Sequence, residues 1–228
     1  MRDFGRRPKP PGTKAVPGAP GTLSAEYQPV KDKYRNFADL DKSEKRGDDF
    51  QVRSRVRAVA TSIIAPHGGG IEPGTSEIAE AVAGGTLSFY AFEGTKARNN
   101  LQLHITSTNF DEPSVLALVA ASDLVVAIHG EDSDQPVAIL GGRDKTTVQR
   151  LSESLQRHGF PVQTDVKGLQ GCEAKNICNR GAQRAGVQIE LSKGLRRTFF
   201  KSLENLVGRQ TKTERFWDFV AAVRKVIA

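Results

Sequence analysis

The sequence predicts an α/β fold in a single domain, with a mixed, mostly parallel sheet between two layers of helices. Three observations support this prediction. Short apolar segments alternate with segments of helical periodicity along most of the chain. The run LVVAI at residues 124–128 is apolar without interruption, which is typical of a strand covered on both faces. Residues 213–227 carry apolar side chains at helical spacing, so an amphipathic helix is expected there.

The other elements follow from local signals. The expected strands are short apolar segments bounded by glycine, proline or asparagine, and they cover residues 56–65, 87–92, 101–105, 124–128, 137–140, 160–164 and 187–191. The expected helices cover residues 77–83, a segment with Pro113 in its first turn, the segment between Asp144 and Gly159, and residues 198–207 and 213–227. The charged segment 26–50 is expected to add a short surface helix, and residues 169–184 are expected to be irregular.

Charge and composition divide the 228-residue chain into two parts. The net charge is +7, and residues 1–21 account for +4 of it with five prolines and four glycines. A segment of this composition cannot bury a core. We therefore expect a disordered basic arm over residues 1–25 and one folded domain over residues 26–228. A mild positive bias suits an anionic partner.

Several classes of protein are not expected. There is no apolar run of about 18 residues, so no membrane span is predicted. The basic N-terminus lacks an apolar core of the secretory type, so the protein is expected in the cytoplasm or released by lysis. No pattern of basic residues interleaved with aromatic ones predicts a nucleic-acid partner. Cys172 and Cys178 are too few for a disulfide framework, and they are expected as free thiols or as one local disulfide. A monomer is expected.

Residues 61–80, TSIIAPHGGGIEPGTSEIAE, combine the end of a predicted strand, a glycine-rich loop and the start of a predicted helix. The β-branched start predicts a buried strand that ends at Pro66. The glycine-rich loop that follows contains His67 and Glu72, and Thr75 or Ser76 can cap the next helix. In open α/β sheets, ligands bind where such strands end.

Four residues at strand ends suggest chemistry: His67, Glu72, His129 and Glu190. Two histidines and one carboxylate form a known ligand set for catalytic zinc, which leaves one position for water. A second carboxylate is then needed to carry the proton of that water, and Glu190 is the candidate. Each residue taken singly has an ordinary alternative, a hydrogen-bonded histidine or an outward-facing strand glutamate. A phosphate-binding loop is a further alternative, but the G-x-x-x-x-G-K-[ST] pattern is absent.

The sequence resembles the poly-γ-glutamate hydrolase family of phages and bacteria. The likeness runs through APHGGGIEPGTSEI at 65–78, LHITSTNFDEP at 103–113, IHG at 128–130, GGRD at 141–144, NICNRG at 176–181 and GVQIELS at 186–192. It covers roughly residues 30–200 in consistent order. It implies a zinc carboxypeptidase-like three-layer sandwich. The basic arm before residue 25 departs from it.

The resemblance also implies roles for individual residues. His67, Glu72 and His129 become the zinc ligands, and Glu190 becomes the general base and acid. Asn179 and Arg180 resemble the pair by which such enzymes hold a substrate carboxylate, and a guanidinium suits that task because it donates two parallel hydrogen bonds. Additional substrate contacts are expected from Arg143, Arg196 and His104. For these three, surface solvation or packing is an equal alternative.

The expected substrate is an anionic chain of glutamates joined through side-chain amides, and the expected cofactor is Zn²⁺. Two competing interpretations remain. The same metal and a single carboxylate-binding arginine would suit small N-acyl glutamates. A non-catalytic polyanion-binding module would explain the basic arm, but such a module has no use for a second carboxylate beside the His/Glu/His set.

Overall fold

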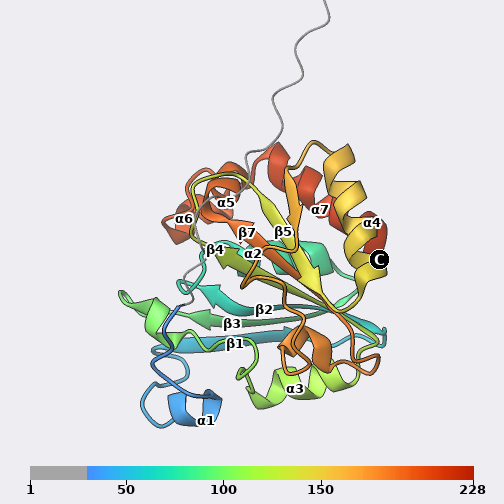
Figure 1. Cartoon of the computed structure of the whole chain (residues 1–228). Helices are drawn as coiled ribbons and strands as arrows, with labels where there is room; N and C mark the ends of the chain where they lie inside the picture. The colour runs from blue at the N-terminus through green and yellow to red at the C-terminus, as the bar shows by residue number, and fades with distance from the viewer. Residues whose placement is uncertain (1–29) are drawn as a thin grey trace, which may run out of the picture.

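A computed structural model describes residues 30–228, so the arm predicted over residues 1–25 lies outside the described residues. The described chain forms one α/β domain around a twisted seven-stranded sheet (Figure 1). The strands are β1 (Phe50–Arg55), β2 (Thr61–Gly69), β3 (Ser88–Gly94), β4 (Leu124–Glu131), β5 (Ala138–Gly142), β6 (Val162–Thr164) and β7 (Val187–Ser192). Their order in the sheet is β1-β3-β2-β4-β7-β5-β6.

The sheet is mixed, as predicted. Strands β3, β2, β4 and β7 are parallel neighbours, whereas β1 pairs antiparallel with β3 and β5 pairs antiparallel with β7. The carboxyl ends of β2, β4 and β7 therefore meet at one edge. Two of the residues singled out from the sequence become neighbours there, because His129 of β4 lies opposite Glu190 of β7 in the register.

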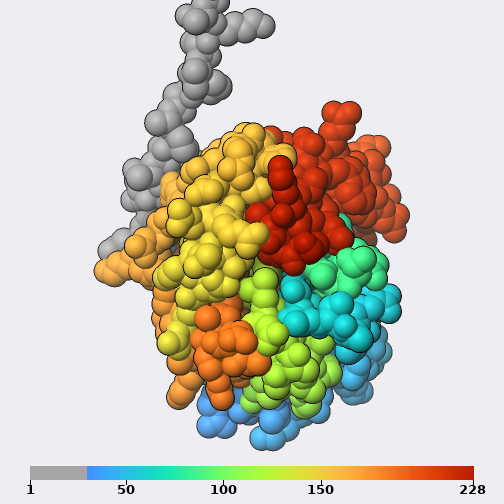
Figure 2. All heavy atoms as spheres, turned by 90° about the vertical axis from the view of Figure 1, so that its right-hand side faces the viewer, coloured from blue at the N-terminus to red at the C-terminus, as the bar shows by residue number. Residues whose placement is uncertain are grey.

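Helices cover both faces of the sheet. The helices are α1 (Phe37–Leu40), α2 (Thr75–Ala83), α3 (Pro113–Ala120), α4 (Lys145–Arg157), α5 (Lys193–Phe199), α6 (Leu206–Gln210) and α7 (Glu214–Ile227), with short 3₁₀ turns η1 (Asn100–Leu103) and η2 (Ile177–Arg180). One buried apolar cluster joins the sheet to α2, α4, α5 and α7, and a second joins the other face to α1, α3 and the 3₁₀ turns. Helices α4 and α7 lie side by side, as the side view shows (Figure 2).

Three predicted elements are wrong. Residues 101–105 begin as a 3₁₀ turn and continue without forming a strand, because Asn99 adopts a left-handed conformation that turns the chain. Residues 198–207 do not form one helix: α5 ends at Phe199, and α6 begins at Leu206. The predicted strand over residues 56–65 begins only at Thr61, and a separate edge strand, β1, precedes it.

Strand β2 contains a bulge at the point where the candidate site begins. Its pairing with β3 shifts by one residue between Ala65 and Gly68, so the strand does not end at Pro66 as predicted. An extra residue in a strand changes the face to which the next side chain points. Ile63 and Ala65 pack into the cluster on the α2 side, whereas His67 contacts Phe110 on the opposite face. The bulge thus turns His67 towards the carboxyl ends of β4 and β7.

Helix α2 is not capped by Thr75 or Ser76. Its cap position is Gly74, which has a positive φ of 95°. The Ser76 hydroxyl instead accepts a hydrogen bond from the Gly69 amide at 3.0 Å, and the Thr75 hydroxyl donates to the Glu72 carbonyl at 2.8 Å. Both hydroxyls therefore brace the loop that carries Glu72.

Two further sequence predictions concern membranes and cysteines. No helix within residues 30–228 is long and apolar enough to cross a membrane. Cys172 and Cys178 are both free thiols, the first exposed and the second buried.

Candidate metal centre and active site

Three of the predicted ligands converge at the carboxyl edge of the sheet. The His67 Nδ1 atom lies 2.9 Å from Glu72 Oε1 and 3.2 Å from His129 Nδ1. The His129 Nδ1 atom lies 3.8 Å from Glu72 Oε2. Both histidines are 2% exposed. The bulge in β2, the loop before α2 and the end of β4 each contribute one of these side chains.

The loop formed by residues 104–107 holds the second nitrogen of each ring. His67 Nε2 lies 2.8 Å from the Ile105 carbonyl, so it must be the protonated nitrogen that donates there. His129 Nε2 faces the Ser107 hydroxyl at 3.4 Å. These contacts turn the Nδ1 atoms of both rings towards Glu72, which is the arrangement that a metal centre needs.

Asp32 anchors that loop from the start of the described chain. Its Oδ1 atom accepts a hydrogen bond from His104 Nδ1 at 2.7 Å, and its Oδ2 atom accepts one from the Thr106 amide at 2.8 Å. His104 is 7% exposed and packs its ring against His67, with the ring centroids 4.1 Å apart. Sequence reasoning did not find Asp32, because it lies 72 residues from His104 and belongs to no motif.

The charges within the cluster balance one another. Burial alone would raise the pKa of Glu72, but the charge and hydrogen bond of His67 and the charge of His129 outweigh burial and hold that pKa at about 2. Burial would lower the pKa of His67, but Glu72 raises it above its usual value. For His129, burial dominates and lowers the pKa to about 3. Glu72 is therefore ionised, and its charge is shared mainly with His67.

The chemistry of this donor set fits a zinc ion. Neutral imidazole nitrogens and a carboxylate are usual zinc ligands, and three protein ligands leave a position for water. Ligands bound tetrahedrally at about 2.1 Å lie about 3.4 Å apart. Here His67 Nδ1 lies 2.9 Å from Glu72 Oε1 and 3.2 Å from His129 Nδ1, and His129 Nδ1 lies 3.8 Å from the other oxygen of Glu72, Oε2. His67, Glu72 and His104 also offer atoms within 4.8 Å of one another. The structure therefore offers two candidates for the third ligand, since His129 Nδ1 and His104 Nε2 lie 3.8 Å and 3.9 Å from an oxygen of Glu72.

Glu190 lies next to His129 in the sheet and is 8% exposed. Burial raises its pKa well above the usual range, and the negative charges of Glu72 and Glu131 raise it further. Gln188 donates a hydrogen bond to Glu190 Oε1 at 2.8 Å. A carboxyl group with a raised pKa beside a metal-type centre is a candidate for taking up and releasing a proton.

The other predicted substrate contacts lie apart from this cluster or are occupied. Arg180 donates to the carbonyls of Lys175, Thr108 and Phe110, which fixes its guanidinium and leaves its remaining N–H groups without a described partner. Asn179 is 1% exposed, and all four hydrogen bonds of its amide go to backbone groups.

Arg143 is exposed at the far end of β5, whose last residue lies opposite Val187 rather than Glu190. Arg196 is 3% exposed. Its guanidinium donates to the carbonyls of Pro73, Glu131 and Leu191. It therefore ties together the backbone behind the site.

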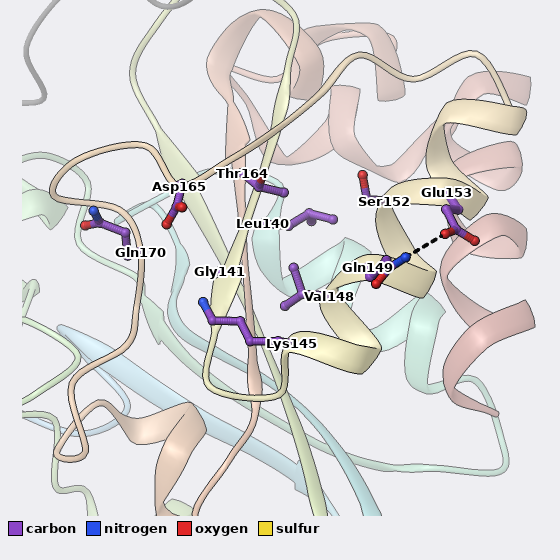
Figure 3. A pocket seen from close by; sticks show the side chains of 10 residues that line it. All are labelled: Leu140, Gly141, Lys145, Val148, Gln149, Ser152, Glu153, Thr164, Asp165 and Gln170. Carbon is purple, nitrogen blue, oxygen red and sulfur yellow. Dashed lines mark hydrogen bonds between the residues drawn. The ribbon is translucent and has the colours of Figure 1, made fainter.

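A cavity of about 330 Å³ lies elsewhere, between α4 and the segment that follows β6 (Figure 3). Leu140 and Val148 form its apolar part, and Lys145, Asp165 and Gln170 are among its polar residues. None of the residues predicted to form the site lines it.

Comparison with known proteins identifies relatives along most of the chain. The family model for poly-γ-glutamate hydrolase matches residues 34–222. The SPbeta prophage-derived protein YoqZ of Bacillus subtilis (strain 168) is 34% identical over 221 residues, which cover 94% of this chain and 80% of that protein. YndL of the same organism is 36% identical over 194 residues, covering 83% and 75%.

Two solved structures share the fold. A bacteriophage poly-γ-glutamate hydrolase superposes with a TM-score of 0.83 at 29% identity, covering 86% of this chain and 96% of that one. A zinc-free structure of YndL superposes with a TM-score of 0.81 at 34% identity, covering 86% and 97%. Together with the match to the family model over residues 34–222, these likenesses show that the chain belongs to the poly-γ-glutamate hydrolase family.

Proposed function

We propose that this protein is a zinc-dependent hydrolase that cleaves the γ-glutamyl amide bonds of poly-γ-glutamate. The observation that carries the proposal is the convergence of His67, Glu72 and His129 beside the buried carboxyl group of Glu190. Membership of the poly-γ-glutamate hydrolase family supports the reaction and the substrate. The zinc-free YndL structure supports the choice of metal.

His67, Glu72 and His129 are the residues that would hold the metal. Bound zinc supplies a Lewis acid that polarises the amide carbonyl and lowers the pKa of water. Glu190 accepts a proton from the attacking water and then donates a proton to the leaving amine. Glu190 enters the first step as a carboxylate, and burial raises its pKa, which makes that carboxylate a stronger base.

The cations of the chain bind the anionic substrate. Arg180 is held by three backbone carbonyls and keeps N–H groups with which to grip a substrate carboxylate. Arg143 is exposed and can contact a more distant glutamate of the polymer. His104 packs its ring against that of His67 and is proposed to contact the substrate beside the metal ligands. In this proposal Asn179 braces the loop beside Arg180 and does not contact the substrate, since its amide is fully used.

The decisive experiment follows the length of poly-γ-glutamate on a gel, with the metal removed by a chelator and then restored. The wild type is expected to shorten the polymer only when zinc is present. Glu190→Gln is expected to bind zinc normally and to lose turnover by about 100-fold or more, because it cannot carry a proton. Glu153→Gln, on the exposed face of α4, is the matched control and should behave as the wild type.

Three outcomes would count against parts of the proposal. Near-normal turnover by Glu190→Gln would show that another group carries the proton. Cleavage that persists in metal-free protein would exclude zinc dependence. An intact polymer in the presence of zinc-loaded protein would exclude this substrate, and small N-acyl glutamates would then be tested.

A further inference from the structure

Two buried amide side chains lie behind Glu190. Gln188 precedes Glu190 by two residues on β7, so both side chains point to the same face of the sheet. Asn176 stands at the start of η2, on a loop that packs against that face. Asn176, Gln188 and Glu190 are 4%, 5% and 8% exposed. Polar groups buried this deeply need hydrogen-bond partners, and these three supply them to one another.

The hydrogen bonds form a chain with one direction. The Cys178 amide donates to Asn176 Oδ1 at 3.1 Å, so the Nδ2 group of Asn176 faces Gln188. Asn176 Nδ2 donates to Gln188 Oε1 at 2.8 Å, and Gln188 Nε2 then donates to Glu190 Oε1 at 2.8 Å. A backbone N–H can only donate, so it fixes the orientation of both amides.

A second contact supports the same orientation of Gln188. The carbonyl of Leu169 lies 3.5 Å from Gln188 Nε2, on the side away from Asn176. If the amide were flipped, its oxygen would face the Leu169 carbonyl and its NH₂ group would face Asn176 Nδ2, so an acceptor would meet an acceptor and a donor would meet a donor. The Gln188 amide therefore has one satisfied orientation.

Packing keeps the Gln188 amide in place. Gly171 has a positive φ of 57°, and a Cβ atom there would lie 2.9 Å from Gln188 Oε1. The backbone of residue 171 is itself held, because Asn179 donates to its carbonyl at 2.7 Å. The loop thus closes on the amide and leaves it no room to rotate away from Glu190.

We propose that Asn176 and Gln188 form a one-way amide relay that aims the Glu190 carboxyl group, which makes both of them positioning residues for hydrolysis. The proposal rests on the proposed function of Glu190. An amide N–H can donate to Oε1 whether or not Oε2 carries a proton, so Gln188 holds the carboxyl group in one orientation through both proton transfers. Oε2 receives no hydrogen bond from a described residue and is the oxygen that carries the proton.

The test compares four variants with the wild type by kcat, KM and zinc affinity. Gln188→Met keeps the size of the side chain but removes the donor, and it is expected to lower kcat about 10- to 100-fold, since misplaced reacting groups cost about that much. KM and zinc affinity should stay within twofold of the wild type. Asn176→Asp still accepts from the Cys178 amide but cannot donate to Gln188, and a smaller fall in kcat is expected.

The double variant tests whether the two residues act as a chain. If Asn176 acts only through Gln188, then Asn176→Asp combined with Gln188→Met should have the kcat of Gln188→Met alone. Gln149→Met is the matched control, because Gln149 is an exposed glutamine of α4 bonded to Glu153 (Figure 3), and its kcat should be unchanged. An unchanged kcat in Gln188→Met would overturn the relay. So would a double variant whose loss equals the product of the two single losses.

A measurement without substrate separates this proposal from the proposed function. The infrared bands of the Glu190 side chain, in whichever protonation state it holds, are identified by their absence from Glu190→Gln, and they should shift in Gln188→Met but not in Gln149→Met. An unshifted band would overturn the relay even in an active enzyme. A shifted band together with a wild type that cleaves no polymer would overturn the proposed function and uphold the contact between Gln188 and Glu190.

Discussion

His67 and His129 each contact the loop formed by residues 104–107 through the ring nitrogen that faces away from Glu72. The carboxylate of Asp32 holds this loop in place. Asp32 accepts hydrogen bonds from His104 Nδ1 and from the Thr106 amide. In the same loop, the Ile105 carbonyl contacts His67 and the Ser107 hydroxyl contacts His129. Groups that orient metal ligands in this way affect the affinity for the metal without touching it.

Replacing Asp32 should therefore weaken zinc binding. Asp32→Ala is expected to raise the zinc Kd about 10- to 100-fold, because the loop at residues 104–107 loses both of its anchors and the rings of His67 and His129 lose their fixed orientation. Competition with a chromophoric chelator measures this affinity. Asp218→Ala, at an exposed position of α7, is the control. An unchanged Kd for Asp32→Ala would mean that the loop keeps its position without the carboxylate.

The protonation of His67 predicts a pH dependence of zinc binding. Glu72 raises the pKa of His67, so in the metal-free protein this ring keeps its second proton, and with it a positive charge, up to a higher pH than an ordinary histidine would. The pKa of His129 is about 3, so that ring is neutral. Zinc must displace that proton. Binding should release about one proton per zinc below the pKa of His67 and fewer above it, so the apparent affinity falls as the pH falls.

Calorimetry in two buffers of different ionisation enthalpy counts the released protons. The same number of protons at mildly acidic and at alkaline pH would contradict the assignment of the proton to His67.

The residues that do the proposed chemistry were predictable from the sequence, and the residues that orient them were not. His67, Glu72, His129 and Glu190 were found because each follows or ends an apolar strand and lies in a recognisable motif. The supporting roles of Asp32 and of the relay through Gln188 depend on which loop folds over which strand. Such contacts join segments far apart in the chain and leave no local pattern.

At the scale of elements, prediction succeeded where burial is complete and failed at edges. Strands β3, β4 and β7 are buried along nearly their whole length, so their apolar character is plain in the sequence. The edge strand β1 was missed because it contains charged residues. Arg53 of this strand pairs with Glu80 and Glu93, partners that only the fold supplies. Residues 198–207 were predicted as one helix, although the chain is extended at Phe200.

The close packing of Gly68 in the β2 bulge predicts the effect of replacing this residue. A Cβ atom on Gly68 would lie 2.0 Å from the Ser76 hydroxyl and 3.0 Å from the Phe92 carbonyl, and the backbone would have to move. Gly68→Ala is expected to lower the free energy of unfolding by about 1–3 kcal/mol and to weaken zinc binding, because the shift reaches His67. Chemical denaturation and chelator competition measure the two effects.

Gly85→Ala is the matched control for this substitution, since nothing lies within 4 Å of its added atom. Equal stability of Gly68→Ala and Gly85→Ala would show that the loop adapts without strain.

At the scale of the whole molecule, the metal-type centre joins parts of the fold that lie far apart in the sequence. A ligand that binds only the folded protein stabilises it in proportion to the logarithm of its concentration over Kd. Zinc at about 100 times its Kd should add about 2.7 kcal/mol, which raises the Tm of a domain of this size by roughly 5–11 °C. Calorimetric scans of the wild type and of His129→Ala test this. A similar rise in His129→Ala would show that zinc stabilises the protein at another site.

The position of β7 also has a consequence for how the protein is made. This strand lies between β4 and β5, yet it follows both of them in the chain. A growing polypeptide therefore exposes His67, Glu72 and His129 to metal before Glu190 leaves the ribosome, and β4 and β5 each keep an unpaired edge until β7 fills the gap. On the proposed function, an incomplete chain would carry the predicted metal ligands without the group that transfers the proton, so the protein would become competent for catalysis only after β7 has been made.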